Sequence, residues 1–169
     1  MPTATYEKIQ TYTLPSNTNS HTFTSIPSTY TDLVIITSNL TCTGAYTLTA
    51  QLNSDTGSNY SWTVLSGNGS AASSLRAAND ARGLCFGAYV NGMSTTVPSV
   101  AVSTILNYSN TTTYKTSLSR LSTASVEVDA NVSLWRSTAA VNSVTLRSSN
   151  PVGSLKTGTI FTIYGIKAA

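Results

Sequence analysis

The sequence predicts an all-β fold, specifically an antiparallel β-sandwich of the jelly-roll kind. Apolar and polar residues alternate at period two in many short segments, which is the pattern of half-buried strands. Turn-forming residues separate these segments about every 8–12 residues, a spacing typical of sandwiches and barrels. Serine and threonine make up about a third of the chain, and threonine is a β-branched residue that suits strand surfaces. We expect about ten short strands, at most one short helix, and a single domain over residues 1–169.

Segment 46–64 has the clearest strand signal. Residues 46–52 alternate so that one face carries Tyr46, Leu48, Ala50 and Leu52. Turn formers at 53–59 separate this segment from a second alternating one at 60–64, so the whole region predicts a β-hairpin with a long loop. The remaining expected strands are 6–14, 21–26, 32–36, 82–90, 99–108, 114–121, 125–135, 141–147 and 159–166.

Three segments allow a more specific prediction. The continuous apolar run 32–36 predicts a central strand that is buried on both faces. In 125–135 we expect the apolar set to face the core and Glu127 and Asp129 to lie on the solvated face; the set is Val126, Val128, Ala130, Val132 and Leu134. Segment 70–82 is rich in alanine, so we expect one short helix there or an ordered loop over a sheet edge.

Charge and composition exclude several classes of protein. Charged residues are 9% of the chain and the net charge is +3, with Lys and Arg scattered from Lys8 to Lys167. Nucleic-acid binding normally needs a concentrated basic stripe, which is absent. The N-terminal sequence does not resemble a signal peptide, and no apolar run is long enough for a membrane span. We therefore expect synthesis in a cytoplasm, with Cys42 and Cys85 as reduced thiols.

Candidate catalytic and metal-binding residues are few. The single histidine, His21, lies in a short strand without a nucleophile motif, so we expect an edge-strand or surface histidine. The Asn53–Gly57 turn resembles a calcium loop only in part, since it lacks the closing acidic residue. Segment Gly67–Gly69 lacks the lysine of a phosphate-binding loop. The sequence predicts no catalytic residue, no metal and no cofactor, and hence a protein that is not an enzyme.

The aromatic residues leave two interpretations open. Tyr60 and Trp62 share the apolar face of their segment, which favours burial in the core. The set could also include a sugar-stacking platform or the anchors of a subunit interface; it comprises Tyr30, Tyr60, Trp62, Tyr89, Tyr108, Tyr114 and Trp135.

Two segments resemble virion structural proteins of tailed phages, especially phages of cyanobacteria and other marine bacteria. The first is Tyr6–Leu14 and continues through Phe23, Ile26-Pro27 and Tyr30–Leu33. The second is the C-terminal Gly158–Lys167. Between them, Asn53–Tyr60 is similar to the Asn-x-Asp-x-x-x-Asn-Tyr turn of the same proteins.

This resemblance implies a capsid decoration (cement) protein that binds and stabilises the head shell. The implied partners are the major capsid protein and copies of the chain itself, as a homotrimer on the capsid surface of the virion. It implies no catalytic residues, and it assigns no residue to an interface. The alternative is a tail-fibre or appendage domain that binds a host surface receptor or glycan. Because the chain has no heptads and no fibrous leader, decoration is the preferred interpretation.

Overall fold

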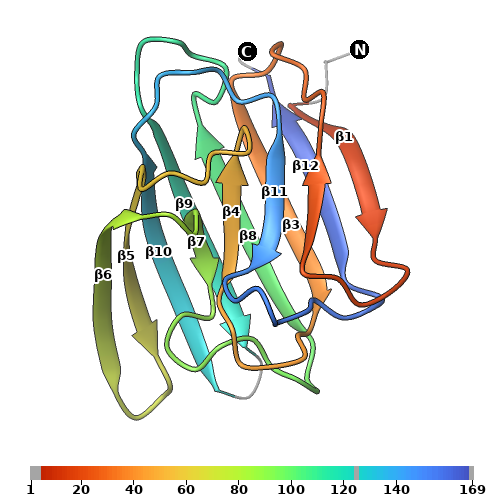
Figure 1. The fold of residues 1–169 in the computed structure, drawn as a ribbon, viewed down its shortest axis with the longest axis vertical. Coiled ribbons are helices and arrows are strands. Elements are labelled where there is room, and N and C mark those ends of the chain that lie inside the picture. The colour runs from red at the N-terminus through yellow and green to blue at the C-terminus, as the bar shows by residue number, and fades with distance from the viewer. Residues whose placement is uncertain (1–4, 124–125, 168–169) are drawn as a thin grey trace.

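The computed structural model describes residues 5–123 and 126–167, which fold into two antiparallel β-sheets packed face to face (Figure 1). The described residues contain no helix, and thus none that could cross a membrane. The predicted β-sandwich is confirmed. Its strands are β1 (Tyr6–Thr13), β2 (Ser20–Phe23), β3 (Asp32–Leu40), β4 (Leu48–Leu52), β5 (Tyr60–Gly67), β6 (Ala72–Asp80), β7 (Leu84–Gly87), β8 (Ser99–Leu106), β9 (Lys115–Thr123), β10 (Glu127–Trp135), β11 (Val144–Ser148) and β12 (Ile160–Ile166).

Eight of these strands form a jelly roll. One sheet contains the order β1-β12-β3-β8 and the other is β2-β11-β4-β7. Within this set the first strand pairs with the last, the second with the next to last, and so on inward, giving β1·β12, β2·β11, β3·β8 and β4·β7. This nested pairing is that of a hairpin rolled into two sheets, as jelly rolls are.

The other four strands are two hairpins that widen one sheet. The β5–β6 hairpin is inserted between β4 and β7, and the β9–β10 hairpin between β8 and β11. They continue the larger sheet beyond β8 in the order β9-β10-β5-β6. We call these four strands the hairpin extension. The smaller sheet meets it mainly through β7, which packs against β5, β9 and β10, and Tyr60 of β5 also accepts a hydrogen bond from the Leu52 N–H of β4.

The predicted hairpin over residues 46–64 is wrong. Strand β4 pairs with β7 and β11 in the smaller sheet, whereas β5 pairs with β6 and β10 in the larger one. Loop 53–59 therefore crosses between the layers. The physical reason is that β11 and β7 occupy both edges of the buried strand β4, which leaves no edge free for pairing with β5.

Segment 70–82 forms neither a helix nor a loop, but the edge strand β6. Its alanines favour a helix, yet the preceding turn decides the outcome. The Asn68 Oδ1 atom accepts hydrogen bonds from the backbone N–H groups of Ser70 and Ala71, and this turn sends the chain back along β5. Pairing with β5 then runs from Gly67↔Ala72 to Trp62↔Ala77. Tertiary pairing thus overrides a weak local propensity.

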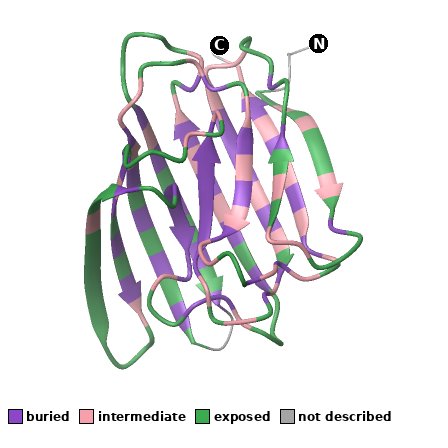
Figure 2. Ribbon diagram, in the orientation of Figure 1, coloured by how far each residue is buried: buried purple, intermediate pink, exposed green. Residues whose placement is uncertain are grey.

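The main hydrophobic core lies between the two four-stranded halves of the jelly roll. Figure 2 shows buried and exposed residues alternating along most strands of the larger sheet. The largest fully buried side chains include Phe23, Phe86, Phe161, Leu33 and Ile35. A smaller cluster of Trp62, Val64 and Cys85 lies under the hairpin extension. The predicted burial of Tyr60 and Trp62 is confirmed.

Both cysteines are buried free thiols, as predicted. Burial raises the pKa of the Cys85 thiol to about 12, so this sulfur stays protonated at neutral pH and behaves as a small core residue.

Candidate docking face

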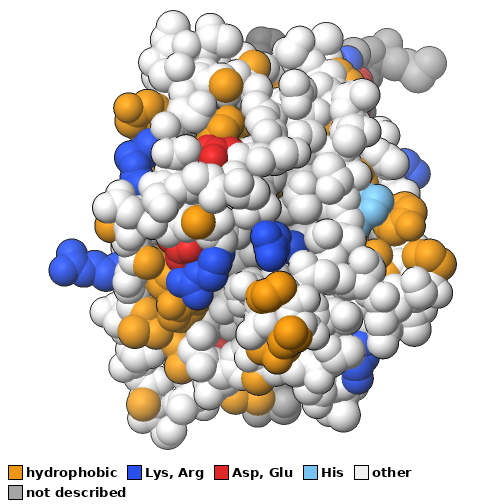
Figure 3. Space-filling model, in the orientation of Figure 1, with side chains coloured by type: hydrophobic (Ala, Val, Ile, Leu, Met, Phe, Trp, Pro, Cys, Tyr) orange, Lys and Arg blue, Asp and Glu red, His pale blue; other side chains and the backbone are white. Residues whose placement is uncertain are grey.

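The outer face of β8, β9, β10 and β5 is an uncovered apolar surface. Strand β8 contributes Val100, β9 contributes Leu118, and β10 contributes Val128 and Val132, which are 48%, 49%, 61% and 50% exposed. Leu65 on β5 is 59% exposed. We call this surface the docking face. Figure 3 shows the opposite side of the molecule, over the smaller sheet, where backbone and side chains that are neither hydrophobic nor charged cover most of the surface and hydrophobic side chains form several separate groups.

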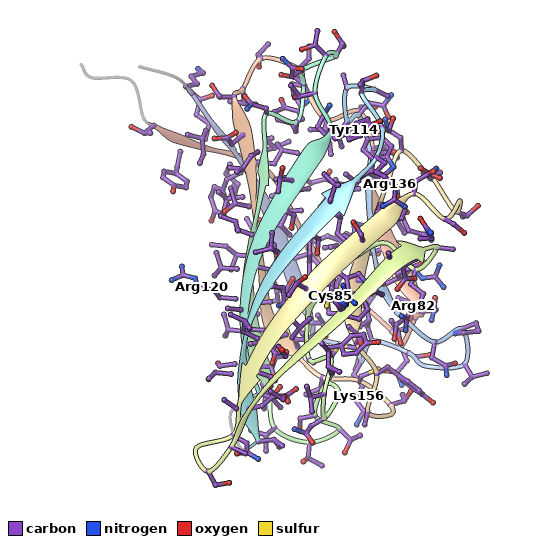
Figure 4. The ribbon with its side chains drawn as sticks, turned by 90° about the vertical axis from the view of Figure 1, so that its left-hand side faces the viewer. Arg82, Cys85, Tyr114, Arg120, Arg136 and Lys156 are labelled. Atoms are coloured by element: carbon purple, nitrogen blue, oxygen red, sulfur yellow. The ribbon has the colours of Figure 1, made fainter. Side chains whose placement is uncertain are left out.

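Arg120 stands in the middle of this face. It belongs to β9, and Figure 4 shows it projecting away from the sheet on the side opposite Cys85. An open depression of about 910 Å³ lies beside it, lined in part by Leu65, Val100 and Val128. Among the described residues Arg120 has no ion pair, since the two that occur join Arg82 to Asp80 and Lys167 to Glu7. The face therefore combines apolar side chains with one unpaired cation.

Strand β10 has the opposite orientation to the predicted one, and its outward side chains form part of the docking face. The prediction placed its valines in the core and its carboxylates in solvent. In the structure Val128, Ala130 and Val132 point outward, whereas Glu127 and Asp129 point inward and are each 4% exposed. Strands β8 and β9 follow the same rule, since Ser99, Ser103, Ser117 and Ser119 are buried while Val100 and Leu118 are exposed.

The inward carboxylates hold the chain that follows β7. Asp129 Oδ2 accepts hydrogen bonds from the backbone N–H groups of Ala88 at 2.7 Å and Tyr89 at 3.3 Å. Glu127 accepts from the Asn91 backbone at 3.2 Å and from the Asn91 side-chain amide at 2.7 Å. A buried carboxylate is tolerated when it accepts such bonds. Reversing β10 would remove these acceptors from the backbone N–H groups of Ala88, Tyr89 and Asn91.

The backbone at Gly87 and Ala88, where β7 ends, is strained and lies close to β9 of the larger sheet. Ala88 has φ 59°, a left-handed conformation that is uncommon for a residue with a Cβ atom. Gly87 has φ 139°, and a Cβ atom there would lie 2.4 Å from Leu121 on β9. Glycine at 87 therefore lets β7 approach β9, and Asp129 stabilises the turn that follows.

A second polar cluster lies at the margin of the extension. Asp80 Oδ2 accepts hydrogen bonds from the Trp62 indole at 2.9 Å and from the Arg82 guanidinium at 2.7 Å. Burial alone would raise the pKa of Asp80, but the hydrogen bonds from Arg82 and Trp62 outweigh it and hold that pKa below its usual value. The Arg82 guanidinium also lies over the rings of Trp62 and Tyr89, so its charge is satisfied within the molecule.

Asp55, in the turn that resembled a calcium loop, binds protein donors. Its Oδ2 atom accepts a hydrogen bond from the Trp135 indole at 2.6 Å, and its Oδ1 atom accepts one from the Gly57 N–H at 2.8 Å. Asn59 donates to the same carboxylate. Within residues 5–123 and 126–167 no group of three or more His, Cys, Asp or Glu residues could hold a metal ion. The sequence predicts a hairpin turn at this position; the segment is a turn stabilised through Asp55, but it joins the two sheets instead of closing a hairpin.

His21 lies on β2, an edge strand of the smaller sheet, as predicted. Its ring stacks on Tyr12 with centroids 3.8 Å apart, and it meets the edge of Phe23 at 4.8 Å. Burial lowers the pKa of the imidazole, and Nε2 has no hydrogen-bond partner among the residues described. The stacking joins β1 to β2 across the two sheets, which is a packing role.

The alternation in the sequence did not predict the docking face. The alternation in 99–106, 115–123 and 127–135 is visible, but it is equally consistent with either face of the strand being buried. The available signal was the regularity of the polar set, because Glu127, Asp129, Asn131 and Ser133 also alternate without interruption. These strands contain two cations, Lys115 and Arg120, and only Arg120 shares the parity of the exposed apolar set.

No protein-family model and no curated protein matches the chain. Among solved structures, the alginate lyase Aly36B is similar at 8% identity, covering 93% of this chain and 79% of that one, with a TM-score of 0.35. A mutant of the same enzyme in complex with an alginate trisaccharide is similar at 8% identity, covering 87% and 80%, with a TM-score of 0.31. At these TM-scores the likeness carries no argument about the activity of this chain.

Proposed function

We propose that this chain is a virion structural protein of the capsid decoration type, which binds and stabilises a phage head shell through its docking face. The observation that carries the proposal is the uncovered apolar surface around Arg120. The resemblance of segments 6–33 and 158–167 to tailed-phage virion proteins supplies the biological setting.

The size of the face supports a protein partner. Five strands about 4.8 Å apart and about 25 Å long span roughly 600 Å² when the outer β6 strand is included. Apolar side chains share this area with polar ones and with Arg76 of β6, and the whole is of the same order as the roughly 800 Å² that each partner buries in a standard interface. A partner that covers the face removes exposed leucine and valine side chains from water.

The charge of the face specifies the partner further. A guanidinium that becomes buried at an interface needs an acceptor, because an unpaired buried charge is strongly unfavourable. Arg120 therefore favours a shell surface that is apolar and places a carboxylate opposite it, where a bidentate pair can form.

Counting copies per virion tests this function. A decoration protein occurs in hundreds of copies, in fixed ratio to the major capsid protein, and its loss leaves heads that assemble but burst more easily on heating. Quantitative mass spectrometry of purified virions measures the ratio. A few tens of copies or fewer, with loss of adsorption in the deletion and robust heads, would reject decoration.

A second function, receptor binding by a virion appendage, is favoured by the unpaired Arg120 beside an open depression. A guanidinium in such a place can pair with the carboxylate of an acidic host glycan. This candidate requires the low copy number and the adsorption defect just described, so the same experiment separates the two functions.

A further inference from the structure

The larger sheet ends at β6, a long and unprotected edge. Figure 2 shows β6 exposed along most of its length, and its burial pattern agrees. An edge strand presents unpaired backbone N–H and C=O groups, which can pair with a strand of another chain. Strand β6 has nine residues, no proline, and Arg76 as the one charge between its ends.

The other three sheet edges carry protective features. Strand β1 has a register shift between Lys8 and Gln10 and carries Glu7 and Lys8. Strands β2 and β7 are four residues long, and β7 packs against the larger sheet. Short strands, bulges and charges are the usual protection against edge pairing. The register of β6 with β5 is regular from Ala72 to Ala77, and its one shift lies at the C-terminal end of the strand, where Asn79 has φ 56°.

We infer that β6 pairs antiparallel with β6 of a second copy of this chain, about a two-fold axis perpendicular to the sheet. Such a contact is self-complementary, because the same residues serve both partners. The axis keeps the outer faces of the two sheets on the same side, so two residues that oppose each other must both have even numbers or both have odd numbers. Three registers then place the two-fold axis near the middle of the strand, at residue 74, 75 or 76.

The side chains select the register centred on Leu75. Centring on Arg76 would oppose two like charges, which is unfavourable across a strand pair. Centring on Ser74 would oppose each Leu75 to a serine. Centring on Leu75, which is 40% exposed, pairs two leucines at the axis and sets Arg76 opposite Ser74 and Ser73 opposite Ala77. This register pairs residues 72–78 and leaves out the irregular end of the strand near Asn79.

Pairing in this way continues the larger sheet through both copies. The two Arg120 side chains are then separated by seven strand spacings, or about 34 Å. Both docking faces belong to the same side of the joined sheet, but the sheet twists by about 20–25° per strand, so the two faces point in different directions. The pairing does not depend on the proposed capsid docking.

Light scattering and disulfide trapping of the purified full-length chain test the inference. The wild type should have twice the monomer mass of 17.7 kDa, whereas Leu75→Lys should be monomeric with an unchanged melting temperature. Val152→Lys, at a site 78% exposed in a distant turn, is the matched control and should remain dimeric. Under oxidising conditions Leu75→Cys should form a disulfide dimer, and Ser73→Cys should not.

A monomeric wild type at high concentration would overturn the inference, as would the trimer that the phage resemblance implies. Equal cross-linking of the two cysteine variants would overturn the register. These experiments use the isolated protein. The dimer can therefore be disproved while the Leu75→Lys monomer still binds capsids, and capsid binding can fail while the dimer is confirmed.

Discussion

At the scale of single residues, Asp55 shows how one carboxylate fixes a crossing between sheets. It accepts hydrogen bonds from Trp135 on β10 and from the Gly57 N–H in its own loop. Burial alone would raise the pKa of Asp55, but the hydrogen bonds from Trp135, Asn59 and Gly57 outweigh it and lower that pKa below its usual value. The folded state therefore binds the proton less tightly than the unfolded chain does.

This shift gives a pH-dependent stability. Because the folded pKa is depressed, the contribution of Asp55 is fully present above the unfolded value near 3.9 and is lost as pH falls through the folded value. We expect Asp55→Asn to lower the free energy of unfolding at pH 7 by about 1–2 kcal/mol. Its further loss between about pH 5 and 2 should be smaller than that of the wild type.

Chemical denaturation at several pH values measures both effects. Asn59→Ala is the control that removes an exposed donor and keeps the carboxylate, and it should give a smaller loss at pH 7. Unchanged stability of Asp55→Asn at neutral pH would contradict the assigned role of this turn.

At the scale of elements, β10 is the strand whose orientation decides the outer surface. Its acidic side chains support the strained turn at Ala88, and its valines are exposed. We expect Asp129→Ala to destabilise the protein by roughly 2–4 kcal/mol, because it leaves buried backbone N–H groups without an acceptor. Val128→Thr, on the opposite face of the same strand, should change stability by less than about 0.5 kcal/mol.

Urea denaturation of the two variants measures this difference. The prediction from alternation alone is the reverse, with the valine change severe and the aspartate change mild. A larger loss in Val128→Thr than in Asp129→Ala would therefore show that β10 has the orientation first predicted.

The contrast between these elements explains how far the sequence could be interpreted. Strand positions were predictable because period-two alternation and turn residues are local signals. In 46–52 the burial of Leu48, Ala50 and Leu52 was predictable because these residues are apolar, but the burial of Thr49 and Gln51 on the other face was not. The orientation of 127–135 was not, because the partners of Glu127 and Asp129 are amides about 36–41 residues away. Likewise, β6 is a strand only because β5 pairs with it.

At the scale of the whole molecule, the jelly roll and the hairpin extension differ in how much of their surface other strands cover. The eight-stranded jelly roll encloses the main core, and the two inserted hairpins extend one sheet beyond it. This extension adds an outer face that no element of the described chain covers, and an open edge at β6. The two surfaces offer one contact to a shell and one to a second copy.

The docking face is tested most directly by co-sedimentation of the purified chain with phage head shells stripped of it. Leu118→Asp and Arg120→Glu, both on exposed side chains of β9, should each weaken binding at least tenfold, or about 1.4 kcal/mol. Lys8→Glu makes the same charge reversal on the outer face of the distant edge strand β1 and should bind as the wild type does. Wild-type binding by both β9 variants, with melting temperatures unchanged, would contradict the claim that this face meets the capsid.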